Sequence, residues 1–481
     1  MRALRRPPVR LALLLVLAAI AGSALLLLRD DDGDGGGDRP AAAPGARSLA
    51  ELQPDRIIRR VEAIRGLKLR KRPRFRVVPS REISALIRRQ QRQDGEAAVS
   101  RDDRVTVAML KLLRMLPADA DLERMQRTLA EDGFLGFYDG SRNEMVIVQR
   151  GPRLPPSAES TIAHELVHAI DDQHFGIFRR AQRLQRGGDE DRALAYLSVV
   201  EGSAEAVASA YVSRYHVPDR DPGDERQLQR LQKQLPYGQL LMLGFPYAFG
   251  QAFVQSLGAP GPAPLVAGAF VARPPRTTAE IIDPSRYAQR ARPARVRVHA
   301  ARLLGPGWVS LTDDDDDDFA AANLLGILVT READAAAALP LVMAWRGGSY
   351  AYLRRRAADG KGCVAPCVSR DAFVGALRMA SADDATKLAA AYGRIVARRR
   401  GARAAGRGAW MADGGGVAVA ARGAQVTIAY APTAALAQRL ARQGATSSAP
   451  PAGEGPAPGG GDGGGGPQPR PGDGSGGTLS R

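Results

Sequence analysis

Two of the five histidines in this 481-residue chain stand four residues apart, in the segment His164-Glu165-Leu166-Val167-His168. Side chains four apart on an α-helix lie on the same face, separated by about 6 Å along the axis. Two imidazoles placed in this way can bind one tetrahedral zinc ion, and the glutamate between them can reach a water beside that ion. The segment therefore predicts a helix over residues 161–171 that carries a Zn²⁺ site, with Glu165 as a general base.

A catalytic zinc site takes a third protein ligand and leaves one position open for water. Glu201 is one candidate, because it stands among apolar residues of a strongly helical stretch, where a carboxylate needs a partner. Glu205, one turn further on, would then accept a hydrogen bond from a ligand imidazole.

His174 is the alternative third ligand, because it follows His164 by ten residues, the spacing of an H-E-x-x-H-x-x-G-x-x-H site. That motif has a glycine where this chain has Asp171. The difference favours Glu201 and leaves His174 as a group behind the ligands or at the end of the helix.

Hydrolysis beside a metal also needs a donor for the developing oxyanion, and Tyr138, Tyr247 and His216 are the candidates. The segment 134–148 is typical of a hairpin around the Asp139-Gly140 turn. Its second strand, over 145–148, would either pair with an extended substrate or lie inside a sheet.

The N-terminus carries arginines ahead of a charge-free apolar run over residues 11–28, about 27 Å long as a helix. Acidic and glycine-rich sequence follows it. We therefore expect residues 1–29 to be a membrane anchor, single-pass with the globular part extracytoplasmic, or a cleaved signal segment that makes the protein secreted.

The formal net charge of +17 would attract anionic polymers or lipid head groups. Nucleic acid is not expected as a partner, because no basic stretch carries interleaved aromatic residues. The two cysteines, Cys363 and Cys367, would form a small-loop disulfide in an oxidising compartment.

The chain is predicted to be α+β, with a zincin-like core that is mainly helical with a small sheet, and a C-terminal α/β extension. Boundaries follow from composition and periodicity. The expected parts are an anchor or signal over 1–29, a flexible linker over 30–48, a catalytic domain over 49–290, the extension over 291–443 and a disordered Gly/Pro-rich tail over 444–481.

Several segments together resemble those of bacterial exported or membrane-anchored zinc metallopeptidases with a gluzincin-like zinc site. They are Gly136-Phe137-Tyr138-Asp139, His164–His168 continuing to Asp172-Gln173-His174-Phe175, and Val200-Glu201-Gly202. This resemblance covers roughly residues 55–440, and it implies that His164, His168 and Glu201 are ligands and Glu165 the general base.

The expected function is hydrolysis of peptide bonds in a peptide or protein substrate outside the cytoplasm. Two alternatives stay open: a non-catalytic, zinc-stabilised scaffold that binds the cell envelope, and an amidase or deacetylase of wall polymers with the same zinc chemistry. Contact with anionic lipid or wall polymer through the basic surface is compatible with each.

Overall fold

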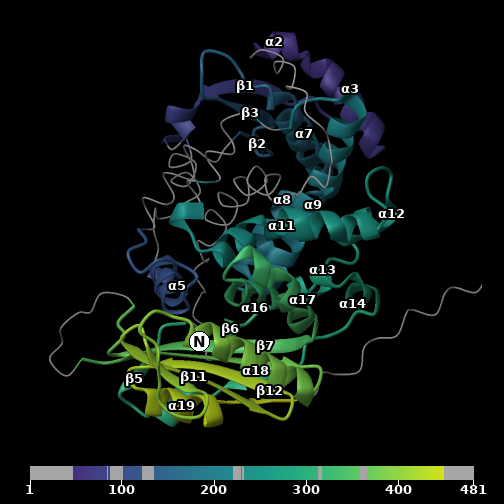
Figure 1. Cartoon of the computed structure of the whole chain (residues 1–481). Coiled ribbons are helices and arrows are strands. Elements are labelled where there is room, and N and C mark those ends of the chain that lie inside the picture. Colours follow the sequence, from purple (N-terminus) through teal and green to yellow (C-terminus); the bar gives the residue numbers. More distant parts are fainter. Residues whose placement is uncertain are drawn as a thin grey trace, which may run out of the picture.

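The computed structural model describes residues 47–83, 85–86, 101–121, 135–219, 221, 229, 232–312, 317–357 and 366–448 (Figure 1). Within these ranges no helix combines the length and the apolar character needed to cross a membrane. The predicted anchor, the linker up to residue 46 and most of the predicted tail lie outside them.

A three-stranded sheet lies at the N-terminal end of the molecule. It consists of β1 (Arg74–Pro79), β2 (Gly136–Asp139) and β3 (Glu144–Gln149), in the order β1-β3-β2. β3 runs parallel to β1 and antiparallel to β2, and the predicted Asp139-Gly140 turn connects β2 to β3. Because β3 is the central strand, the strand predicted over 145–148 is internal, and β2 is the strand at one edge.

Helices surround this sheet and extend away from it (Figure 1). They are α2 (Leu49–Leu52), α3 (Pro54–Arg65), α5 (Arg101–Leu112), α7 (Ala158–Phe175), α8 (Ile177–Arg186), α9 (Glu190–Tyr215), α11 (Tyr237–Ser256), α12 (Pro264–Phe270), α13 (Thr278–Ile282) and α14 (Pro284–Ala288). α7 packs between α3, β2 and α9, and its Ile162, Leu166 and Ile170 are fully buried, as an amphipathic pattern predicts.

α9 and α11 approach each other so closely that only glycine fits at their crossing. A Cβ on Gly202 would lie 2.2 Å from the carbonyl carbon and oxygen of Gly250, and a Cβ on Gly250 would lie 2.1 Å from the carbonyl oxygen of Ser198. Gly202, next to Glu201, therefore faces α11 and not α7.

The C-terminal part is a larger sheet with helices on both faces. Within the described residues its strands are β5 (Trp308–Ser310), β7 (Trp345–Arg355), β8 (Asp371–Met379), β12 (Gln425–Ala431), β11 (Gly415–Arg422), β10 (Ala409–Ala412) and β9 (Arg403–Ala404), in that spatial order, with β6 (Asp317–Asp318) paired to β7. β4 (Val296–Val298) pairs separately with β13 (Ala445–Ser447).

The two faces of this sheet bury different cores. α18 (Ala382–Ala397) and α16 (Ala321–Leu328) cover one face, and α19 (Ala434–Gln443) covers the other with alanine and leucine side chains. α15 (Ala300–Leu304), the 3₁₀ turn η2 (Glu332–Asp334) and α17 (Ala335–Met343) complete the described elements.

One hydrophobic core joins the predicted catalytic domain to the predicted extension. It runs from Met115 and Phe245 on the helical side through Leu325 of α16 to Leu388 and Ile428 of the C-terminal sheet. The boundary predicted at residue 291 therefore separates two parts of the sequence that are packed against each other.

β4 ends at Val298, because the helix-forming run Ala300-Ala301-Arg302-Leu303-Leu304 forms α15. The tail predicted from residue 444 is wrong in its start, because residues 445–447 form β13 against β4.

We expect Gly202→Ala to destabilise the protein by about 1–3 kcal/mol, because the added methyl group overlaps the backbone of α11. Gly268→Ala is the matched control, since Gly268 lies in α12 with nothing within 4 Å of the added Cβ. That change should be neutral or stabilise by up to about 1 kcal/mol. Urea unfolding of both variants measures the difference, and equal effects would contradict the close crossing.

Candidate metal centre

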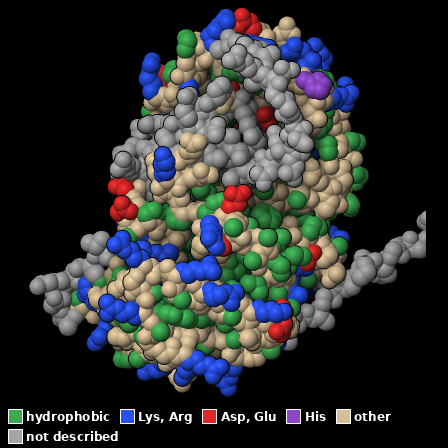
Figure 2. Space-filling view, viewed as in Figure 1, with side chains coloured by type: hydrophobic (Ala, Val, Ile, Leu, Met, Phe, Trp, Pro, Cys, Tyr) green, Lys and Arg blue, Asp and Glu red, His purple; other side chains and the backbone are tan. Residues whose placement is uncertain are grey.

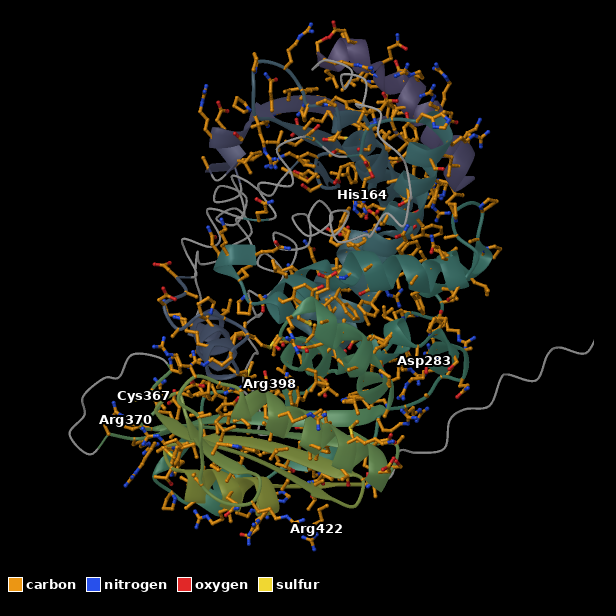
Figure 3. The ribbon with its side chains drawn as sticks, in the orientation of Figure 1. His164, Asp283, Cys367, Arg370, Arg398 and Arg422 are labelled. Atoms are coloured by element: carbon orange, nitrogen blue, oxygen red, sulfur yellow. The ribbon has the colours of Figure 1, made fainter. Side chains whose placement is uncertain are left out.

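α7 presents the two histidines of the H-E-x-x-H segment on one face, as the four-residue spacing requires. The ring centroids of His164 and His168 lie 4.8 Å apart, with the ring planes at 81°. Both side chains lie inside the fold, with 16% and 7% of their surfaces exposed. Figure 3 labels His164 between the sheet end of the molecule and α11.

Glu201 of α9 completes a three-atom arrangement around the two imidazoles. Its Oε2 lies 3.4 Å from Nε2 of His164 and 3.4 Å from Nε2 of His168. Ligand atoms about 2.0–2.1 Å from a tetrahedral zinc ion are separated by about 3.3 Å. The two separations from Oε2 of Glu201 thus match the spacing between ligands of one zinc ion.

The charges at this point are strongly coupled. Burial alone would lower the pKa of His164, but its interactions with Glu201 and Glu205 raise it from 6.5 to about 10. Burial would raise the pKa of Glu201, but the neighbouring charge of His168 and the interaction with His164 lower it from 4.5 to about 2. Glu201 is therefore a carboxylate at neutral pH, as a metal ligand must be.

Glu205 lies behind His164, one helical turn beyond Glu201. Its Oε2 is 3.6 Å from Nδ1 of His164. Its Oε1 accepts a hydrogen bond from Ser209 at 3.2 Å, and Ser209 in turn accepts one from Gln251 of α11 at 3.1 Å. These hydrogen bonds hold the Glu205 carboxylate beside Nδ1 of His164, so Nε2 of His164 faces Glu201.

Glu165 occupies the same cluster but is held differently. One ligand atom from each of His164, Glu165 and His168 lies within 4.8 Å of the others, so Glu165 is a second acid that could complete the site. Oε2 of Glu165 accepts a hydrogen bond from the backbone N–H of Tyr138 at 3.0 Å. Because β2 already holds one oxygen of Glu165, Glu201 is the stronger candidate for a third ligand, and Glu165 lies beside it.

Of the three predicted oxyanion donors, the structure brings Tyr247 to the centre. Its ring stacks against His164, with centroids 6.1 Å apart. Burial, and then the charges of Glu201 and Glu165, raise the pKa of Tyr247 well above 10, so its hydroxyl stays protonated.

The other two candidate donors do not face the centre. The hydroxyl of Tyr138 donates to Oδ1 of Asn143 at 3.0 Å, and only its backbone reaches Glu165. His216 is exposed at the C-cap of α9, about 22 Å along the helix from Glu201.

His174 also lies away from the imidazoles of His164 and His168. α7 continues without a turn to Phe175, which puts His174 about 9 Å beyond His168 along the axis. Its Nε2 lies 2.8 Å from the carbonyl oxygen of Lys68. In this arrangement His174 binds the segment after α3 and does not contribute to the cluster.

Asp171, which replaces the glycine of the longer motif, anchors α7 from inside. It is 1% exposed, accepts from Nε of the buried Arg65 at 2.9 Å and accepts from Oγ of Ser203 at 2.8 Å. Ser203 stands two residues after Glu201, so this carboxylate sets α7 against the ligand-bearing segment of α9. Sequence reasoning missed this role, although a lone acid in an apolar helix face was a signal for it.

A second buried acid, Glu159, fixes the other end of α7. It accepts a hydrogen bond from the hydroxyl of Tyr211 at 2.8 Å and pairs with Arg56 at 3.2 Å and Arg60 at 3.4 Å. α3, α7 and α9 are thus tied together at both ends of the helix that carries the histidines.

Cys367 lies on the far side of the molecule, just before β8, and is disulfide-bonded. Its predicted partner, Cys363, lies outside the described residues.

Comparisons with known proteins reach only the C-terminal part. The family described as "Domain of unknown function (DUF8575)" matches residues 312–441, which run from just before β6 to α19. No curated protein matches the chain, and no solved structure matches it. The metal centre lies outside the matched residues.

We predict that His164 stabilises the metal-free protein more at low pH than at high pH. Its folded pKa of about 10 lies above its ordinary 6.5, so its contribution is complete below about pH 6.5 and is lost as pH rises through 10. Urea unfolding of chelator-treated protein should therefore show a gap between the wild type and His164→Gln that is wide at pH 6 and narrow at pH 10. A gap that does not change with pH would contradict the coupling of His164 to Glu201.

Proposed function

We propose that this chain is a zinc-dependent peptidase that hydrolyses peptide bonds outside the cytoplasm. The observation that carries the proposal is the pair of equal 3.4 Å separations that join Oε2 of Glu201 to the two imidazole nitrogens. The zincin-like character of the helical part is included in the proposal, supported by a small sheet whose edge strand lies beside the histidine helix.

His164, His168 and Glu201 would hold the zinc ion. The bound ion would supply an activated water and polarise the scissile carbonyl. Zinc is favoured over a hard cation because two imidazoles and one carboxylate are the ligands it prefers, whereas Mg²⁺ and Ca²⁺ take oxygen.

Glu165 would act as the general base and then the general acid. Its carboxylate takes the proton of the attacking water as the water oxygen joins the carbonyl carbon. As the C–N bond breaks, Glu165 passes that proton to the leaving nitrogen, so that water is added across the peptide bond. Tyr247 has a protonated hydroxyl near this position and would donate a hydrogen bond to the developing oxyanion.

The edge strand β2 would align an extended substrate. The N–H of Val148 donates a hydrogen bond to the carbonyl of Leu135. Hydrogen-bonded and non-hydrogen-bonded residue pairs alternate along two antiparallel strands, so the backbone N–H and C=O groups of Gly136 and Tyr138 point away from β3. The N–H of Tyr138 already points at Glu165, which puts this edge beside the reacting groups. An extended peptide would pair with it by β-augmentation.

The extracytoplasmic location rests on the arginine-flanked apolar run over residues 11–28. It would place peptide substrates of the envelope or the exterior within reach. A non-catalytic scaffold would need neither a free carboxylate at Glu165 nor a protonated Tyr247 beside the ligands. A wall amidase or deacetylase would use the same groups.

We expect Glu165→Gln to keep zinc and to lose hydrolysis by about 10²–10⁴-fold, because it removes the proton acceptor and leaves the ligands intact. Zinc content by elemental mass spectrometry and cleavage of an unfolded protein substrate and of wall peptides measure the two effects. Glu332→Gln, an exposed glutamate of η2, is the matched control and should retain both properties.

Three outcomes separate the possibilities. Equal activity of Glu165→Gln and wild type would refute the proposed role of Glu165. Wild-type protein that holds zinc and cleaves nothing would favour the scaffold, and cleavage of wall substrates alone would favour the amidase.

Glu201→Ala should lose zinc and His174→Ala should keep it, and the reverse result would overturn the ligand assignment.

A further inference from the structure

A cavity of about 430 Å³ lies where the helical part meets the C-terminal sheet. Its walls come from the end of α5, the start of α11, the end of α16, the end of α18 and the β10–β11 turn. None of its lining residues belongs to the metal centre. Figure 3 labels Arg398 at this boundary, and Figure 2 shows basic side chains gathered over it.

The polar side of the cavity is strongly positive. Arg114, Arg398, Arg399 and Arg400 line it, and Asp413 is the acid among the lining residues. Guanidinium groups this close repel one another, and a single carboxylate leaves a net charge of about three positive units. An anion in the cavity would relieve that repulsion.

Asp413 pairs with two of these arginines, Arg114 and Arg399, and not with the other two. It lies 3.3 Å from Nη1 of Arg399, and Nη2 of Arg399 donates to the hydroxyl of Tyr430 at 2.7 Å. The side chains of Arg398 and Arg400 are exposed, and neither has an ion pair or hydrogen bond to another described residue. Two arginines that line the cavity therefore have guanidinium donors to spare.

The backbone at the Arg114–Asp413 pair is unusual on both sides. Arg114 has φ 64° and Asp413 has φ 58°, both in the left-handed region. Asp413 starts the two-residue Asp413-Gly414 hairpin turn, where such a φ is common. Arg114 follows the end of α5, where the N–H of Met115 donates to the carbonyl of Leu110 at 2.8 Å, so its φ belongs to the helix C-terminus and fixes the residue at the edge of the cavity.

Part of the cavity wall is apolar. Leu113 and Met115 come from the turn after α5, Ile327 from α16 and Ile395 from α18. An inorganic anion would leave this wall in contact with water. A ligand with an apolar body attached to an acidic head would cover it.

We propose that this cavity binds a small amphiphilic phosphate, with its head on Arg398 and Arg400 and its apolar chain against the Leu113–Ile395 wall. Guanidinium groups match phosphate oxygens with paired hydrogen bonds, which favours phosphate as the head group. A free alkyl phosphate and a lipid head group share this chemistry.

Calorimetric titration of the full chain with hexyl phosphate tests the proposal, with hexanol and inorganic phosphate as the two half-ligands. We expect hexyl phosphate to bind more tightly than either half. Arg398→Gln/Arg400→Gln should weaken it by about tenfold or more, because charge-assisted hydrogen bonds are lost. Arg407→Gln/Arg422→Gln removes the same charge from exposed positions on the sheet and should bind as the wild type does.

Vesicles of phosphatidylglycerol distinguish the two sources of the head group. Vesicle binding that hexyl phosphate displaces indicates a lipid, and hexyl phosphate binding without vesicle binding indicates a free phosphate ester; both support the site. Equal affinity for hexanol, or unchanged affinity in Arg398→Gln/Arg400→Gln, would overturn it. Glu165→Gln should bind hexyl phosphate normally, so this result is independent of the proposed hydrolysis.

Discussion

Oε2 of the buried Glu201 lies at the same distance from Nε2 of His164 and from Nε2 of His168. The packing of α9 against α7 and α11 keeps these three side chains together. A carboxylate is costly to bury unless charged partners surround it. Asp171 is a second buried carboxylate, and its ion pair with Arg65 offsets the cost of burying both charges. Its hydrogen bond from Ser203 fixes α7 against α9, two residues from Glu201. The crossing at Gly202 and Gly250 then brings α11 and its Tyr247 up to the cluster.

α11 connects the metal centre to the rest of the molecule. Its middle carries Tyr247 and Gln251 beside the metal centre, and its first turn, at Pro236 and Gly238, lines the arginine-rich cavity. The core that α11 enters continues through α16 into the C-terminal sheet. The part matched by a family of unknown function is thus structurally continuous with the helical part and is not a separate appendage.

Local patterns predicted much of the helical part. The helix over 161–171, the helical stretch around Glu201 and the 134–148 hairpin follow from periodicity and turn residues, and they correspond to α7, α9 and β2–β3. β7 and β8 escaped prediction because Gly347 and Gly375 interrupt their apolar runs. A Cβ at Gly347 would lie 2.2 Å from the carbonyl oxygen of Ala294, a contact between distant segments that no local pattern encodes. The roles of Asp171 and of Gln251 likewise depend on partners far along the chain.

The most direct test of the account is where a metal ion binds. Crystals of the protein grown with zinc, with diffraction recorded at the zinc absorption edge, locate the ion by its anomalous signal. The account predicts a peak about 2.0–2.2 Å from Nε2 of His164, Nε2 of His168 and Oε2 of Glu201. A peak beside His174 would contradict the account. So would a zinc ion bound elsewhere while His164 and His168 stay paired with Glu201 and bind no metal.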